Sequence, residues 1–180
     1  MGLINIKDFA PSAVDSFFFD TNVWLLLFGD VANFQKAEQS KYSKALQSLL
    51  DRDAIIFITS NVISEFSNVL LKKEYNVWRN KVENTGKDYK RDFVVNEIYL
   101  QQIEVISNLI TTIVKLPCVQ KMPDNFNSVN LNRILERFKS IDFNDAYIAE
   151  ICQSKSLKLI TNDRDFFSLK DELDIVSALA

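Results

Sequence analysis

Four segments of the sequence place a carboxylate beside a predicted strand or at the start of a predicted helix. Asp20 ends the buried strand predicted for "SFFFD", and Glu65 lies one turn into the helix that follows the next strand. Asp145 stands in the first turn of a later helix, and Asp163 follows the strand predicted for "LKLIT". Because the carboxyl ends of parallel strands meet at one edge of a sheet, we expect these four side chains to lie close together.

Such a cluster indicates a metal site. Like charges in one cleft disfavour full ionisation unless a cation is present. The chain contains no histidine, which excludes His-ligated zinc and both Ser-His-Asp and Cys-His catalysis. An all-oxygen cluster suits Mg²⁺ or Mn²⁺. These ions can activate a water and stabilise the leaving oxygen of a phosphodiester, so the pattern predicts metal-assisted phosphodiester hydrolysis without a covalent intermediate.

Each acid also has a structural alternative. Asp20 could accept backbone N–H groups at a strand end, and Glu65 could be an exposed helix residue. Asp163 could cap a short helix. Asp142 is interpreted as a helix cap rather than a ligand, because an acid three residues later resembles a capping box. We take Asp20, Glu65, Asp145 and Asp163 as site residues, and Asp165 as a further candidate ligand.

The elements that must position these acids alternate between strands and helices, which predicts an α/β fold with a mostly parallel sheet. Asn22 is predicted to cap the helix that ends at Phe28, and Ser60 or Asn61 the helix after the second strand. Glu150 is placed on the polar side of its helix. The predicted strands are Ser16–Asp20, Ala54–Thr59, Leu157–Thr161 and Leu173–Ala178; the other predicted helices are Ala32–Leu50, Val95–Val114, Val129–Phe138 and Phe143–Gln153, with a turn or short helix over Asn162–Leu169.

The bulk properties indicate one ordinary domain. The chain has 180 residues with only three Gly and three Pro, which leaves little room for linkers, so we expect a single domain over residues 1–180. No apolar run approaches the ~18 residues of a membrane span, and the N-terminus is too mixed for a secretory signal. The two distant cysteines suit a reducing cytosol, so the expected location is cytoplasmic.

A basic segment stands out from the otherwise acidic chain. Residues 72–91 carry seven basic and three acidic side chains, whereas the whole chain has a net charge of −3. Aromatic residues lie among or close to these charges, and bases of single-stranded RNA stack on such rings while Lys and Arg contact phosphates. Lys87, Lys90 and Arg91 are therefore candidate RNA-binding residues. The alternative is a solvated face whose aromatic rings pack on the core or on a second subunit.

The motifs "FFFDTNVWL", "ITSNVISEF" and "NDAYIAEICQSKSLKLITNDRDF" together resemble the PIN domain, as in the VapC-type toxins of bacterial toxin–antitoxin pairs. The resemblance covers roughly residues 16–71 and 140–176, and the segment around 72–125 is a variable helical and basic insertion. It implies a three-layer α/β/α fold and an acidic Mg²⁺ or Mn²⁺ site that cuts single-stranded RNA. By motif, Asp20, Glu65, Asp145 and Asp163 match the catalytic acids and Asp165 a further acid, and the small polar residues that support the carboxylates are Thr21, Asn22 and Thr161.

The resemblance also implies partners, an antitoxin protein and a second copy in a homodimer. Two other functions stay open at this stage. A phosphatase-like phosphoryl-transfer enzyme would use Asp20 as a nucleophile, although such enzymes usually carry an Asp two residues later, where this chain has Asn22. A non-catalytic scaffold of the same fold would have no need to hold four repelling acids together.

Overall fold

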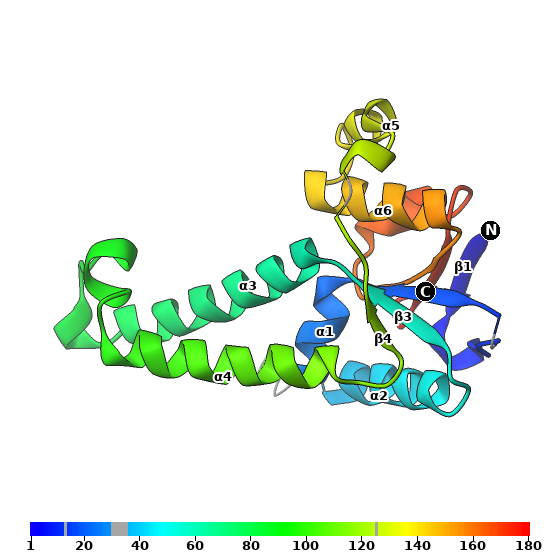
Figure 1. Cartoon of the computed structure of the whole chain (residues 1–180). Coiled ribbons are helices and arrows are strands. Elements are labelled where there is room, and N and C mark those ends of the chain that lie inside the picture. Colours follow the sequence, from blue (N-terminus) through cyan, green and yellow to red (C-terminus); the bar gives the residue numbers. More distant parts are fainter. Residues whose placement is uncertain (13, 30–35, 125) are drawn as a thin grey trace.

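The apolar segments pair side by side in one six-stranded parallel sheet (Figure 1). The computed structural model describes residues 1–12, 14–29, 36–124 and 126–180. The strand order is β1-β6-β5-β2-β3-β4. The strands are β1 (Gly2–Asn5), β2 (Ser16–Phe19), β3 (Ile55–Ile58), β4 (Val119–Lys121), β5 (Lys158–Ile160) and β6 (Asp174–Ser177).

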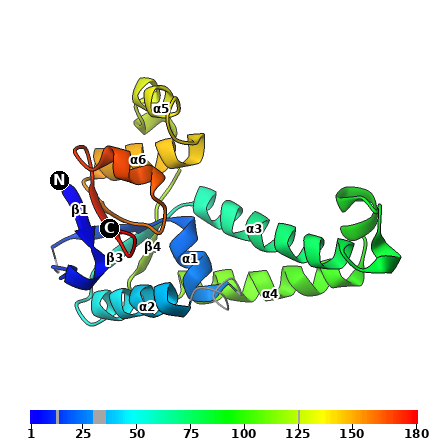
Figure 2. The ribbon, with the colours of Figure 1, turned by 180° about the vertical axis from the view of Figure 1, so that it is seen from behind.

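Helices cover both faces of the sheet, which confirms the three-layer α/β/α prediction. Figures 1 and 2 show α5 and α6 on one face and α1 and α2 on the other. The helices are α1 (Thr21–Phe28), α2 (Lys36–Leu50), α3 (Ser60–Arg79), α4 (Glu97–Val114), α5 (Leu131–Arg137) and α6 (Phe143–Lys155), joined by short helical turns at Ile6–Asp8, Val82–Asn84, Tyr89–Phe93, Phe126–Ser128 and Asp165–Leu169. Residues 32–35 of the helix predicted from Ala32 lie outside the described residues.

The core lies where the central strands meet the helices on either side. Phe17, Phe18 and Phe19 of β2 are all fully buried, because the side chains of a strand point alternately to the two faces and helices cover both faces here. Trp24 of α1 packs on Phe19, with ring centroids 5.0 Å apart. None of the described helices combines the length and the apolarity that a membrane span requires.

The helices α3 and α4 form a long hairpin that extends away from the sheet (Figures 1 and 2). This hairpin accounts for most of the variable segment predicted around 72–125. At its far end, five aromatic rings pack on one another with centroids 5.1 to 6.1 Å apart: those of Tyr75, Trp78, Tyr89, Phe93 and Tyr99. Of these, Trp78 and Phe93 are 2% and 0% exposed, so their rings close the hairpin and are not available to stack on bases.

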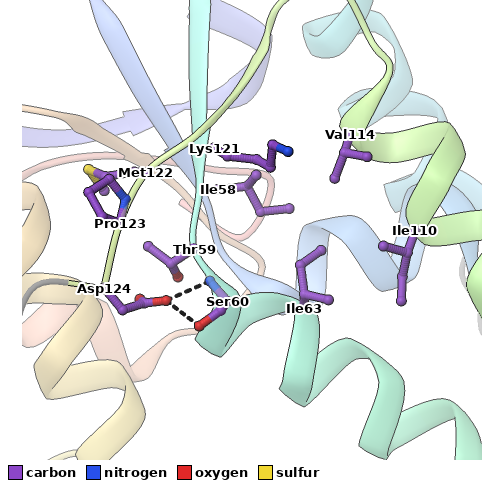
Figure 3. A pocket seen from close by; sticks show the side chains of 10 residues that line it. All are labelled: Ile58, Thr59, Ser60, Ile63, Ile110, Val114, Lys121, Met122, Pro123 and Asp124. Atoms are coloured by element: carbon purple, nitrogen blue, oxygen red, sulfur yellow. Dashed lines mark hydrogen bonds between the residues drawn. The ribbon is translucent and has the colours of Figure 1, made fainter.

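Two predicted helix caps are wrong. The N-cap positions of α1 and α3 are Asp20 and Thr59, and neither side chain makes a capping hydrogen bond. At α3 the cap comes from a distant part of the chain, because the carboxylate of Asp124 accepts hydrogen bonds from the backbone N–H of Ser60, at 2.7 Å, and from the Ser60 hydroxyl. Figure 3 shows this contact beside an apolar pocket of about 590 Å³ that lies between β3, β4, α3 and α4.

The prediction that Glu150 faces solvent is also wrong. Glu150 is fully buried, because α5 packs over α6 and covers that face. Its carboxylate accepts hydrogen bonds from Arg133 at 2.6 Å and from Arg137 at 3.2 Å, and from the backbone N–H of Asn130 at 3.1 Å. A charged carboxylate is costly to bury unless it is paired, and here the pairing fixes α5 on α6.

Candidate metal centre

The strand order explains why the predicted acids meet. Strand β2 lies between β3 and β5, so the residues that follow these three strands share one edge of the sheet. Asp20 directly follows β2, Glu65 lies on α3 after β3, and Asp163 follows β5. Asp145 enters from the first turn of α6. The charges of all four interact, because Asp145 experiences repulsion from Asp20, Asp163 and Glu65.

Asp20 is the most enclosed acid of the cluster, at 3% exposure. Burial raises its pKa to about 7, and the negative charges of Glu65 and Asp163 act in the same direction. A hydrogen bond opposes this shift: the Thr161 hydroxyl donates to Asp20 Oδ2 at 2.9 Å. Because its pKa lies near neutrality, Asp20 binds a proton readily at pH 7 when no cation is near.

Asp145 responds to the cluster in the same way. The pKa of Asp145 is raised to about 8. Partial burial is the largest cause, and the negative charges of Asp20, Asp142, Asp163 and Glu65 raise the pKa further. Asp142 itself is exposed and is the N-cap of α6, because its carboxylate accepts the backbone N–H of Asp145 at 2.9 Å. This confirms the interpretation of Asp142 as a cap. Two carboxylates with raised pKa values in one cluster indicate a site that lacks a compensating positive charge.

The three predicted polar residues each form a hydrogen bond with a different acid. Thr21 Oγ1 donates to Glu65 Oε2 at 2.9 Å, and Asn22 Nδ2 donates to Asp163 Oδ2 at 3.3 Å. Thr161 donates to Asp20, as described above. Both Thr21 and Asn22 lie in the first turn of α1, so this turn holds one carboxylate from α3 and one from the segment after β5.

Asp165 joins the cluster through a tight turn. The backbone N–H of Asp163 donates to Thr161 Oγ1 at 2.9 Å, and the backbone N–H of Asp165 donates to Asp163 Oδ1 at 3.0 Å. One carboxylate oxygen from each of Asp145, Asp163 and Asp165 lies within 4.8 Å of the other two. Three oxygen ligands at this spacing fit a hard divalent cation.

A buried tyrosine forms hydrogen bonds with the turn that carries Asp163 and Asp165. The hydroxyl of Tyr42, on α2, lies 2.7 Å from the backbone carbonyl of Thr161 and 3.0 Å from Asn162 Oδ1, and it accepts the backbone N–H of Ala178 at 3.0 Å. Tyr42 is fully buried. The sequence alone does not identify this role. Tyr42 lies on the apolar stripe of α2, where it looks like an ordinary core residue.

The predicted basic residues lie apart from the acids. Lys87, Lys90 and Arg91 lie in the connection between α3 and α4, and Figure 1 shows this connection at the end of the hairpin far from the sheet. Helix α3 alone extends about 20 Å from Glu65 to Arg79. Lys87 Nζ donates to Asn84 Oδ1 at 2.7 Å and lies 5.4 Å from the centre of the Trp78 ring. Arg91 pairs with Asp92 at 3.0 Å. The structure therefore does not bring this cluster to the acidic site.

Comparisons with known proteins concern both the family and the fold. The family model for the PIN domain matches residues 17–172. The crystal structure of PAE2754 from Pyrobaculum aerophilum is similar with a TM-score of 0.52 and 16% identity, covering 95% of this chain and 89% of that one. VapBC2 from Rickettsia felis, bound to a DNA fragment from its promoter, gives the same TM-score and identity, covering 89% of this chain and 97% of that one. No curated protein matches the chain.

Proposed function

The chain belongs to the PIN-domain family, whose members are generally nucleases, and from this premise we propose that it is a Mg²⁺- or Mn²⁺-dependent endoribonuclease that hydrolyses single-stranded RNA. The observation that carries the proposal is the acidic edge of the sheet, where Asp145, Asp163 and Asp165 bring carboxylate oxygens within 4.8 Å of one another and the charges of Asp20 and Glu65 act on the same site. Without a cation, this arrangement opposes its own ionisation, since the pKa values of Asp20 and Asp145 are about 7 and 8. A bound divalent ion offsets this repulsion.

The donor set fits the ion. Every candidate ligand is a carboxylate oxygen, which Mg²⁺ and Mn²⁺ prefer over the sulfur and nitrogen donors that zinc sites favour. When bound, such an ion activates water and stabilises the charge that develops on the departing oxygen of a phosphodiester. The chain itself supplies rigid ligands: Thr21, Asn22 and Thr161 each fix the direction of one carboxylate.

We propose that the protein is the toxin of a toxin–antitoxin pair, bound by an antitoxin protein and assembled as a homodimer in the cytoplasm. The likeness of its fold to VapBC2 from Rickettsia felis supports the antitoxin partner. Lys87, Lys90 and Arg91, at the tip of the hairpin, would contact phosphates of longer RNA at a distance from the cleavage point.

The test is a cleavage assay on a labelled single-stranded RNA with Mg²⁺, with Mn²⁺ and with EDTA. The wild-type protein should cut only with metal. Asp142→Asn is a matched control, because Asn is also a good N-cap and the variant keeps every acid of the cluster. It should remain active. Cleavage in EDTA would contradict the proposal, and so would the absence of cleavage with both metals by a folded wild-type protein.

A further inference from the structure

A groove that contains both polar and aromatic side chains leads away from the acidic cluster between the N-terminal turns of α3 and α6. Two adjoining cavities of about 380 and 200 Å³ form it, and both are lined by Asn61, Ser64 and Asn144. The smaller cavity includes Glu65, and Asn144 directly precedes Asp145 in the sequence. We call these two cavities the α3–α6 groove. It is therefore continuous with the site proposed for hydrolysis.

Large aromatic side chains at the far end of the groove remain open to solvent. Phe126 is 53% exposed and Phe143 is 38% exposed. Both line the larger cavity, together with Tyr147. The rings of Phe126 and Tyr147 stack with their centroids 6.3 Å apart and their planes at 28°. Exposed aromatic rings that gather beside a polar cavity, rather than singly, are typical of a binding surface.

The polar side chains between these rings and the acids are available to a ligand. Asn61, Ser64 and Asn144 form no side-chain hydrogen bond with any other residue that the structure describes. Amides and hydroxyls both donate and accept hydrogen bonds, as the edges of unpaired nucleobases do. The charged residues that line the two cavities are Lys72, Glu65 and Asp124, and the Asp124 carboxylate is bonded to Ser60. Recognition here therefore relies on stacking and neutral hydrogen bonds more than on phosphate charge.

We propose that the α3–α6 groove binds unpaired bases of single-stranded RNA beside the cleavage point, with Phe126 and Phe143 as stacking platforms and Asn61, Ser64 and Asn144 in contact with base edges. The inference rests on the proposed function, since it places the substrate of that same site. It assigns substrate selection to a surface without net positive charge rather than to the basic hairpin tip. Double-stranded RNA is excluded by the same surface, because its bases are already stacked and paired.

The test measures binding without cleavage, by fluorescence anisotropy of a short labelled single-stranded RNA in EDTA. The double variant Phe126→Ala/Phe143→Ala should bind roughly tenfold more weakly for each ring removed. Phe126→Leu/Phe143→Leu keeps the apolar surface without the flat rings, and it should lose nearly as much affinity. Leu100→Ala, which alters an exposed apolar residue on α4, is the matched control and should bind like the wild type.

Two outcomes would overturn the inference. One is unchanged RNA affinity in both double variants. The other is full affinity in the leucine variant with a loss only in the alanine variant, because this would mean that the rings serve as an apolar contact, for example for a protein. Calorimetric titration with Mn²⁺ separates this test from the proposed function: neither ring belongs to the acidic cluster, so both double variants should bind the ion with the affinity of the wild type. If the wild type binds no Mn²⁺ but ring removal weakens RNA binding, the inference about the groove holds and the proposal of a metal-dependent nuclease is contradicted.

Discussion

The acidic cluster and the basic hairpin tip are both charge-rich, but they are built in opposite ways. The acids come from four separated segments and meet because β2 lies between β3 and β5. The basic residues are neighbours in sequence and remain at the end of the α3–α4 hairpin, where Arg91 already pairs with Asp92. Charges gathered by the sheet form a partly buried, mutually repelling site, whereas charges adjacent in sequence form an exposed surface. Changes in the first region should therefore affect activity far more than changes in the second.

The largest effect is expected from Asp20→Asn and Asp145→Asn. Each removes one proposed metal ligand and should lower metal-dependent RNA cleavage by at least about a hundredfold. Both variants should nevertheless unfold at a temperature equal to or above that of the metal-free wild type, because each removes a buried or repelled carboxylate. Cleavage rates check the predicted loss of activity, and thermal melts in EDTA check the predicted stability. A variant that melts well below the wild type would point to a structural role for that acid.

A smaller loss is expected from Thr161→Val, which keeps the shape of the side chain and removes its hydroxyl. That hydroxyl donates to Asp20 and accepts the backbone N–H of Asp163, so its loss should lower cleavage roughly 10- to 100-fold without removing any ligand. Thr112→Val on the hairpin is the matched control, since the Thr112 hydroxyl bonds only to the backbone of its own helix. Equal activity in the two variants would show that Thr161 does not orient the site.

The raised pKa of Asp20 predicts a dependence of stability on pH. Its carboxyl titrates near pH 7 in the folded chain and near its ordinary value of 3.8 in the unfolded chain. Between these values the folded state holds more protons, so the contribution to stability is complete below pH 3.8 and is lost as the pH rises towards 7. The free energy of unfolding in EDTA should fall with a slope on the order of 1 kcal/mol per pH unit relative to Asp20→Asn. Urea titrations of both proteins over a range of pH measure this slope. Free energies of unfolding that change with pH in the same way in both proteins would refute the prediction.

The smallest effect is expected at the hairpin tip. Replacing Lys87, Lys90 and Arg91 together by Ala should weaken binding of a long single-stranded RNA only a few-fold and leave cleavage of a short one unchanged. The slope of log affinity against log salt should become shallower by roughly 0.7 for each phosphate that the variant no longer neutralises. The alanine double variant of the α3–α6 groove should leave that slope unchanged. A salt slope unaffected by the triple variant would leave the tip with a structural or partner-binding role only.

The sequence predicts the acidic site better than its surroundings, and the reason is physical. Asp20 and Asp163 are tied to the ends of central strands, so a parallel sheet alone brings them together. The cap of α3 comes from Asp124, 64 residues after Ser60, and no local pattern indicates such a contact. Glu150 falls on the polar side of a helical projection, but only the packing of α5 reveals that it is buried.

Two further elements escape prediction because the local signal is short. The segment "GLIN" is too brief to predict as a strand, and β1 forms by pairing with β6, from Gly2 opposite Asp174 onwards. No local signal predicts where helix α3 ends; it continues to Arg79, because α4 and the aromatic rings at the tip cover its second half. In both cases a distant part of the chain supplies the stabilising contact.

The central claim, that the acidic cluster holds a divalent cation, is tested most directly by calorimetric titration of the metal-free protein with Mn²⁺. The wild type and Asp142→Asn should both bind the ion, whereas Asp145→Asn should bind at least about tenfold more weakly. Binding should release protons, because Asp20 and Asp145 are partly protonated near pH 7 without metal. Equal affinity in Asp145→Asn and the wild type, or no binding to any of the three, would contradict the claim.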